Sequence, residues 1–311
     1  MAITAAMVKE LREMTGAGMM DCKKALNETN GNMDEAVEFL RKNGQAKAEK
    51  KASRIAAEGL CMVVTKDDQT AAVVEVNSET DFVAKNATFQ EFVKAVATQA
   101  VNSDAADMDA FMAEKWNEDA SKTVSEALVE KVAVIGENLK IRRFEKVVAE
   151  HGCVVPYVHG GGRIGVIVDA DTDVVNDTVK EAMHNIAMQI AALNPKYVSR
   201  DEVSADYIAH EKEILLAQIM NDPKESQKPE KVINGMIEGR ISKELKEVCL
   251  VDQVYVKAED GKQTVAKYLE EVSKAVGGTV KVKRFVRFET GEALEKKQED
   301  FAAEVAAQMN A

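Results

Sequence analysis

The stretch GLCMVVTKDDQTAAVVEV, residues 59–76, decides the fold. Two apolar, β-branched runs at residues 60–65 and 71–76 flank a polar turn at residues 67–69. Such a pair of runs is typical of an antiparallel β-hairpin. Apolar residues at helical spacing then follow over residues 89–100. The sequence therefore predicts a hairpin followed by a helix.

The same order of patterns recurs later in the chain. Strand, strand and helix patterns follow one another at residues 153–158, 163–170 and 175–190. Gly59 at the start of the first unit matches Gly152 at the start of the second. Each unit closes with a strand pattern after a helix, at residues 139–148 and 280–288. We therefore predict a duplicated α+β core of two subdomains.

The first 43 residues predict a compact three-helix module. Met7, Leu11 and Met14 fall at helical spacing, and glycine or asparagine separates the later helical patterns. About 40 residues lie near the lower limit for independent folding, so we expect a small docking module on a tether. That tether is residues 44–54, rich in Lys and Ala, which can extend or become helical.

Two further segments lie outside the duplicated core. Residues 199–247 predict two helices separated by Pro223 and Pro229, and we interpret them as an inserted antiparallel helical hairpin. Its exposed apolar stripe favours a homodimer through these residues. Near the end, Phe301 and Val305 belong to a short amphipathic helix that also contains Met309. The expected domains are residues 1–54, 55–150, 151–198 with 248–290, 199–247 and 291–311.

Charge argues against nucleic acid as a partner. The formal net charge is -12, and residues 1–54 carry ten Lys and Arg against eight Asp and Glu, which leaves -14 for residues 55–311. The basic run at residues 47–54 could be an RNA-binding patch, but no aromatic residues interleave with it to stack bases. We interpret this run as a solvated linker.

Cysteine usage and hydropathy favour the cytoplasm. The four cysteines lie far apart without a CxxC pair or histidines at zinc spacing, and so predict buried thiols in a reducing compartment. The first sixteen residues carry Glu10 and Glu13 and lack the features of a signal or transit peptide. No run approaches the roughly 18 apolar residues that a membrane helix needs.

Three sequence features resemble ligand-binding or catalytic motifs but lack the neighbouring residues or elements that those motifs require. Residues 160–165 fit GxGxxG, but a strand follows where a dinucleotide site needs a helix, which favours a hairpin turn. Residues 169–180 begin like a calcium loop, but Val174 replaces the required glycine and Lys180 the bidentate glutamate. The four histidines lack paired spacing. We predict no catalytic residues, no metal site and no cofactor.

Residues 77–86, NSETDFVAKN, place an aromatic residue beside an acid in a polar turn. Taken alone, Phe82 caps the core seven residues before Phe89. The segment TDFVAKN, however, resembles the signature of the elongation factor Ts family. The further motifs that carry this resemblance are TGAGMMDCKKAL (15–26), IGEN (135–138), His159 with RIG (163–165) and DFAAEVAA (300–307). They keep the family's order along essentially the whole chain.

The resemblance implies a fold and a function. The fold has an N-terminal three-helix module of the ubiquitin-associated type, a two-part core, an inserted coiled-coil hairpin and a C-terminal helical module. The implied function is exchange of guanine nucleotide on elongation factor Tu. The protein would bind Tu both when Tu carries GDP and when Tu is free of nucleotide. Thr80, Asp81, Phe82 and Val83 would press between helices of its GTPase domain and disturb the magnesium and phosphate site.

The resemblance also implies further contacts with Tu. Leu11, Met19, Met20 and Lys23 would dock the N-terminal module on the same GTPase domain, and His159 with Arg163 would grip a different domain. A third set of contacts would come from Ile135, Gly136, Glu137 and Asn138. From the residues alone, either Met19 or Met20 could instead belong to the core of the bundle, since adjacent helical residues cannot share a face.

Two other functional classes remain. A ubiquitin-associated-type adaptor or scaffold rests only on the N-terminal module, and it would leave GDP release from Tu unchanged. An enzyme built on the glycine turn would bind nucleotide by itself. Neither class accounts for the order of the motifs.

Overall fold

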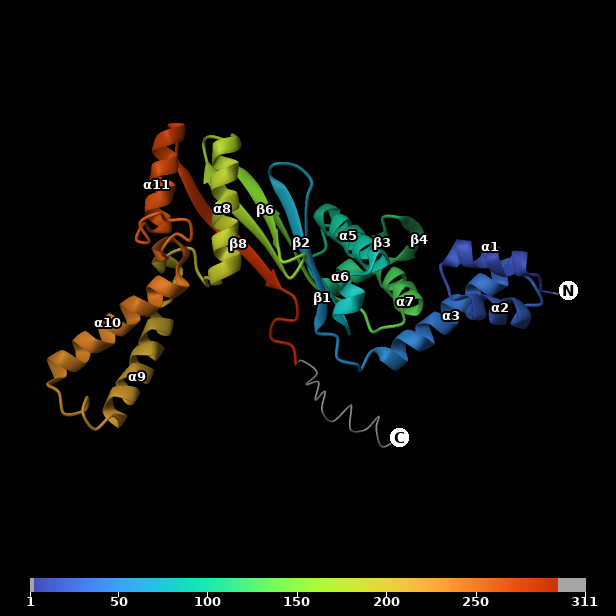
Figure 1. The fold of residues 1–311 in the computed structure, drawn as a ribbon, viewed down its shortest axis with the longest axis horizontal. Helices are drawn as coiled ribbons and strands as arrows, with labels where there is room; N and C mark the ends of the chain where they lie inside the picture. Colours follow the sequence, from blue (N-terminus) through green and yellow to red (C-terminus); the bar gives the residue numbers. More distant parts are fainter. Residues whose placement is uncertain (1–2, 296–311) are drawn as a thin grey trace.

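The computed structural model describes residues 3–295 and combines helices with antiparallel strands (Figure 1). The predicted mixture of helix and strand is confirmed. The predicted C-terminal helix with Phe301, Val305 and Met309 lies outside the described residues.

Three helices at the N-terminus pack around a small core of their own. They are α1 (Ala5–Thr15), α2 (Met19–Glu28) and α3 (Met33–Lys51). Thr4 caps α1 by accepting a hydrogen bond from the amide of Met7, and the chain turns at Gly16. Leu11 and Leu26 are completely buried between the helices.

The segment predicted as a tether is a helix packed on the rest of the protein. α3 continues to Lys51 and lies along α7 (Val124–Ile135) (Figure 1). Gly44 is buried there, and a Cβ atom at this position would lie 3.6 Å from Cβ of Ala133. The Nζ atom of Lys51 donates to the carbonyl of Gly136 at 2.6 Å. Residues 47–51 of the basic run thus belong to a helix, which the prediction for the tether allowed, and Lys47 and Lys50 remain exposed.

Each half of the core contains one three-stranded antiparallel sheet covered by helices. The first half comprises β1 (Glu58–Thr65), β2 (Thr70–Ser78), α4 (Asp81–Ala84), α5 (Ala87–Asn102), α6 (Met108–Ala113), β3 (Lys115–Trp116), β4 (Asp119–Thr123), α7 and β5 (Lys140–Val148). The second comprises β6 (Cys153–His159), β7 (Ile164–Thr172), α8 (Asp177–Leu193), α11 (Val265–Val276) and β8 (Val280–Glu289). The sheet orders are β1-β2-β5 and β6-β7-β8.

The two sheets stack face to face between two layers of helices. Along β2, Val74 packs in the cluster that includes α5 and α7, whereas Val73 packs against the other sheet. Along β7, Val168 packs under α8 and α11, whereas Ile167 faces the first sheet. This alternation follows from the two-residue period of side chains along a strand. The central strands β2 and β7 are thereby buried on both faces.

The two halves share unusual backbone features at matching places. The register of β2 on β5 shifts between Glu75 and Val76, and that of β7 on β8 shifts between Asp169 and Ala170. A Cβ atom on Gly59 would lie 2.1 Å from the carbonyl oxygen of Val76, and one on Gly152 would lie 2.1 Å from that of Ala170. Both glycines have positive φ, so each close approach requires glycine.

The halves also exchange equivalent backbone hydrogen bonds. The amide of Val154 donates to the carbonyl of Asp68 in the β1–β2 turn at 2.8 Å, and the amide of Cys61 donates to the carbonyl of Gly162 in the β6–β7 turn at 2.6 Å. Each hairpin turn therefore pairs with the first strand of the opposite half. Such reciprocal contacts are characteristic of a two-fold relation.

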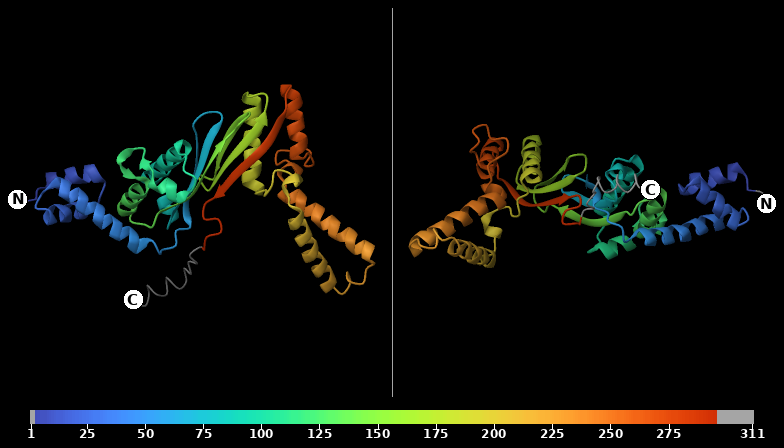
Figure 2. Two further views of the ribbon diagram at one scale, coloured as in Figure 1. Left: turned by 180° about the vertical axis from the view of Figure 1, so that it is seen from behind. Right: turned by 60° about the horizontal axis from the view of Figure 1, so that its bottom comes forward.

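A helical hairpin projects from the second half (Figure 2). It consists of α9 (Ala205–Asn221) and α10 (Glu230–Val248), flanked by short 3-10 turns at Arg200–Glu202 and Leu250–Asp252. Its helices pack through a separate cluster whose buried aliphatic members are Val203, Ile219, Ile233, Ile237, Ile241 and Leu245. The hairpin thus stabilises itself beside the two-sheet core.

Candidate functional site

Phe82 lies on a single helical turn between β2 and α5 and is 80% exposed. Thr80 caps this turn, α4, by accepting a hydrogen bond from the amide of Val83 at 3.3 Å. Val83 is partly buried and Ala84 is buried against the first half of the core. The interpretation of Phe82 as a core residue is wrong, because one side of α4 is anchored while the aromatic ring faces solvent.

Asp81 presents a carboxylate next to that ring. The Nζ atom of Lys85 contacts its Oδ2 atom at 2.6 Å and lies 5.9 Å from the centroid of Phe82. The hydrogen bond from Lys85 lowers the pKa of the Asp81 carboxyl. Asp81 is thus ionised at neutral pH, and α4 offers an apolar group and a negative charge side by side.

Residues 135–138 lie against the same turn. Ile135 packs partly buried against the helical core, and Gly136 ends α7 with a φ of 88°. The Glu137 carboxylate accepts from the amides of Glu79 and Thr80 at 3.0 and 3.1 Å, and from the Thr80 hydroxyl at 2.7 Å. The Asn138 amide donates to Glu79 at 2.6 Å. This segment therefore contacts the two residues that lead into α4, and we call Thr80 together with α4 the Phe82 turn.

The glycine turn lies across a shallow pocket from α4. Its residues Gly160 and Gly161 line this pocket of about 270 Å³ together with Asp81, Lys85 and Arg163. The turn joins β6 directly to β7, as the sequence analysis predicts, so no helix begins there to bind phosphate. The structure thus brings the predicted contact residues of the second half close to those of the first.

His159 and Arg163 flank this turn with exposed side chains. The Nδ1 atom of His159 lies 2.8 Å from the hydroxyl of Tyr157, and Nε of Arg163 lies 3.8 Å from a carboxylate oxygen of Glu289. Both contacts are at the surface, and both side chains can reach a partner without disturbing the core.

The N-terminal module presents a second set of exposed groups. Met19 and Met20 are 60% and 73% exposed, so neither belongs to the core of the bundle, and Lys23 is exposed beside them. Leu11 is completely buried. Its predicted role in docking is therefore corrected: it holds the three helices together and offers no surface to a partner.

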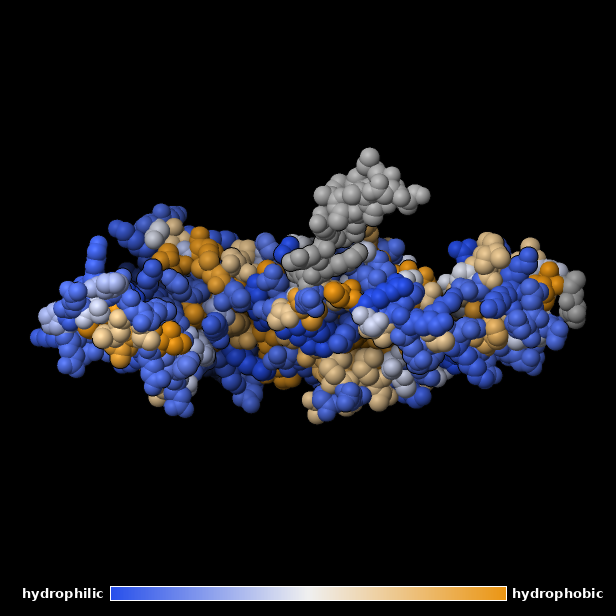
Figure 3. All heavy atoms as spheres, turned by 90° about the horizontal axis from the view of Figure 1, so that it is seen from below, coloured by the Kyte–Doolittle hydropathy of each residue, from blue (hydrophilic) through white to orange (hydrophobic). Residues whose placement is uncertain are grey.

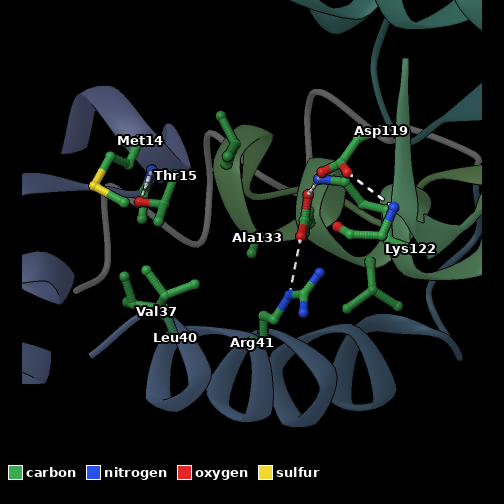
Figure 4. A pocket seen from close by; sticks show the side chains of 14 residues that line it. Met14, Thr15, Val37, Leu40, Arg41, Asp119, Lys122 and Ala133 are labelled. Atoms are coloured by element: carbon green, nitrogen blue, oxygen red, sulfur yellow. Dashed lines mark hydrogen bonds and ion pairs between the residues drawn. The ribbon is translucent and has the colours of Figure 1, made fainter. Parts of the chain in front are cut away.

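A cleft of about 390 Å³ separates this module from α7 and β4 (Figure 4). Met14 and Val37 line its apolar side, while Arg41 reaches across from α3 to within 3.6 Å of Glu130 on α7. Glu130 also contacts Lys122. The pair of Arg41 with Glu130 joins the module to the core, and the pair of Glu130 with Lys122 lies within the core.

Exposed apolar groups are dispersed over the protein. On the face in Figure 3, they form small spots in a largely hydrophilic surface. A contact built from such groups uses several separate anchors, because no broad apolar patch covers that face.

Glu75 is a residue that the sequence analysis missed. It is completely buried on β2 and accepts hydrogen bonds from Arg142, Arg143, Asn77 and the amide of Gly291. The available signal was a lone acid within an apolar strand, since a buried charge requires partners. This network connects the first half to the segment after β8 and supports the scaffold of the site.

Within residues 3–295, no group of three or more His, Cys, Asp or Glu side chains is arranged to hold a metal ion. Among the same residues, none of the helices has both the length and the apolarity to cross a membrane. The four cysteines are free and buried.

Comparison with known proteins gives full-length matches. A family model described as Elongation factor TS matches residues 79–292, more than half of the chain. The protein named Elongation factor Ts from Clostridioides difficile (strain 630) is 53% identical over 308 residues, which cover 99% of each chain. Proteins of the same name from Clostridium novyi (strain NT) and Clostridium perfringens are 51% and 50% identical, and the matches cover 99% and 98% of each chain.

Proposed function

This chain belongs to the elongation factor Ts family, and we propose that its Phe82 turn drives the release of GDP from elongation factor Tu. The chain is a guanine-nucleotide exchange factor for elongation factor Tu in translation elongation. The observation that carries the proposal is the 80% exposure of Phe82 on a turn whose other side is anchored in the core.

Exchange requires the factor to bind nucleotide-free Tu more tightly than GDP-bound Tu. By linkage, the factor and GDP then weaken each other's binding by the same ratio. A wedge meets this requirement, because the ring of Phe82 gains its burial only when Tu opens to receive it. Asp81 adds a negative charge that repels or redirects the groups supporting the magnesium and phosphate site of Tu. No bond is made or broken, so the protein needs no catalytic residue or cofactor.

The remaining contacts hold Tu while the wedge acts. Met19, Met20 and Lys23 dock the N-terminal module, which belongs to the ubiquitin-associated type, on the GTPase domain. His159 and Arg163 grip a different domain of Tu. Thr80 and Val83 complete the α4 contact. Because α3 packs along α7, the N-terminal module and α4 have a fixed spacing. The contact made by the module can therefore hold α4 in place against the GTPase domain.

The projecting hairpin has a separate role in our proposal. Ile214, Leu216, Met220 and Val232 are exposed on α9 and α10. The apolar stripe predicted for the hairpin is buried between its own two helices, but these other apolar side chains are exposed and favour self-association. We therefore assign residues 199–247 to a coiled-coil homodimer contact, with the protein acting in the cytoplasm and without nucleic acid.

The substitution Phe82→Ala tests the wedge. A buried aromatic anchor contributes about 2 to 4 kcal/mol to an interface, or about 30- to 1000-fold. Allowing for redundant contacts, we expect stimulated GDP release to slow by at least about tenfold. The melting temperature stays close to that of the wild type, because the ring is exposed in the free protein.

Val175→Ala is the matched control. Val175 is 44% exposed in the connection from β7 to α8, which is the corresponding place in the other half. We expect unchanged exchange from this variant. Wild-type exchange by Phe82→Ala, or an equal loss with both variants, would reject the assignment of the wedge.

A further inference from the structure

The helix that carries Phe82 is too short to hold its own shape. α4 has four residues, Asp81–Ala84, and a single turn fixes several backbone dihedral angles in return for one hydrogen bond. Val83 and Ala84 fasten its inner side to the core. They leave the beginning of the turn, where the exposed Asp81 and Phe82 lie, dependent on other contacts.

Glu137 supplies those contacts. One carboxylate oxygen accepts the amides of Glu79 and Thr80, and the other accepts the Thr80 hydroxyl. All three donors belong to the two residues directly before α4. Hydrogen bonds to an ionised carboxylate are roughly twice as strong as neutral ones. A single side chain thus fixes the approach of the chain into the Phe82 turn.

The contact is reciprocal. Glu79, two residues before Asp81, accepts from the amide of Asn138, the residue after Glu137. The side-chain amide of Asn138 then donates to the carbonyl of Arg54 at 2.8 Å, just beyond the end of α3. Each segment therefore uses a glutamate to bind the backbone of the other, and the arm that carries the N-terminal module joins the same cluster.

We propose that Glu137 is a positioning residue: it holds the Phe82 turn in the orientation that enters Tu. The inference rests on the proposed function, and it replaces the prediction that Glu137 itself contacts the partner. Its two oxygens are directed at residues 79 and 80 and are occupied by three donors, so its hydrogen bonds are made within the chain. Its effect on exchange then passes through Phe82.

The test is a double-mutant cycle on GDP release from Tu, measured at saturating concentration of the factor. E137A should slow release by about tenfold, the change expected for losing charge-assisted hydrogen bonds worth about 1.4 kcal/mol. In the F82A background, E137A should add less than about a twofold change, because the residue it positions is gone. E137Q should recover most of the rate, since its carbonyl oxygen still accepts the two amides.

A structural readout accompanies the kinetics. In E137A, amide hydrogen exchange at residues 79 and 80 should accelerate, while amides in β2 and α5 keep their protection. Glu126→Ala is the matched control. Glu126 lies at the other end of α7 and also accepts a backbone amide, that of Thr123, at 2.7 Å. The Glu126→Ala variant should change neither the rate of GDP release nor the amide hydrogen exchange of residues 79 and 80.

The outcomes separate the inference from the proposed function. Full activity of F82A overturns the proposed function, and with it the inference. A slow F82A whose rate falls a further tenfold on adding E137A overturns the inference alone, because Glu137 then contacts Tu directly. A normal rate of GDP release by E137A also overturns the inference alone.

Thr80→Val serves if E137A folds poorly. It removes the hydroxyl that donates to Glu137 and that also caps α4, and it leaves the Glu137 carboxylate with its two amides. A smaller loss that also disappears in the F82A background supports the positioning role, and a loss that persists there contradicts it.

Discussion

The two halves of the core have the same framework but differ in the connection that leaves the central strand. In the first half, the chain leaves β2 at Ser78 and begins α5 after Asn86, with α4 between them. In the second, it leaves β7 at Thr172 and begins α8 after Asn176, with no helix between them. Phe82 therefore lies on an added turn in one half only. The proposed wedge therefore occupies a connection on a repeated scaffold, where the sequence can vary more freely than in the packed strands.

The halves also treat their buried acids differently. Glu75 receives donors from two arginines, an asparagine and a backbone amide, whereas Asp169 receives only Arg284 at 3.4 Å among the described residues and its Oδ1 atom has no partner there. Burial raises the pKa of Glu75, but the hydrogen bonds and the arginine charges outweigh it, and the pKa is lowered. Burial raises the pKa of Asp169, and Arg284 only partly opposes the shift. The surroundings of Glu75 thus stabilise its charged form, and those of Asp169 disfavour it.

Removing Glu75 should have the largest effect. Glu75→Ala leaves Arg142 and Arg143 without their buried counter-charge, so we expect a loss of about 3 to 5 kcal/mol in the free energy of unfolding, measured with urea. Asp169→Asn is the comparison, and it should cost less than about 1 kcal/mol, because one oxygen is already unpaired. Equal losses from the two variants would remove the distinction between the halves.

The shared glycines should respond alike. Gly59→Ala and Gly152→Ala each place a Cβ atom 2.1 Å from a backbone oxygen at positive φ, and each should cost about 2 to 3 kcal/mol in urea unfolding. Gly239→Ala on α10 is the control. Nothing lies within 4 Å of its Cβ, so helix propensity should stabilise it by up to about 1 kcal/mol. A cost in only one half would show that the two close approaches are not equivalent.

The opposite pKa shifts predict opposite pH dependences. Glu75 has a lowered pKa, so its contribution to stability is complete above its ordinary value of 4.5 and is lost as the pH falls through the lowered one. Asp169 has a raised pKa, so stability decreases as the pH rises from its ordinary value of 3.8 through the raised one. The urea midpoint of unfolding should be measured against pH for each variant. Compared with the wild type, Glu75→Gln should lose less stability as the pH falls, and Asp169→Asn should lose less stability as the pH rises toward neutral. Identical profiles for both variants would contradict these signs.

Deleting the helical hairpin should have the smallest effect on nucleotide exchange. The hairpin is an insertion in the second half, far from α4, and it packs through its own cluster (Figure 1). Replacing residues 199–247 with a short glycine linker should change GDP release by less than about twofold. It should weaken self-association in sedimentation, because exposed apolar side chains favour such contacts. An unaltered oligomeric state would reject the homodimer proposal, and lost exchange would mean that the hairpin supports the wedge.

Local patterns in the sequence were sufficient for most of the elements. The predicted strands at residues 60–65 and 71–76 lie within β1 and β2, and the helical spacing of Ile233 and Ile237 lies within α10. The match of Gly59 with Gly152 also identified two positions with the same backbone geometry. Side-chain period and turn residues act over a few positions, so they can be recognised without the fold.

Only the tertiary structure decided which side chains are available for contact and what holds them. Leu11 and Met14 share a helical spacing, yet Leu11 is buried and Met14 is 60% exposed, because the packing of three helices leaves one end of the stripe uncovered. The sequence analysis placed Glu137 among the contacts with Tu, whereas its hydrogen-bond donors in the structure are residues 79 and 80. The pairing of β2 with β5, which sets Asn77 opposite Lys140, brings these residues within reach of Glu137. Hydrogen bonds between distant segments depend on how the layers close, and short-range patterning carries no record of that geometry.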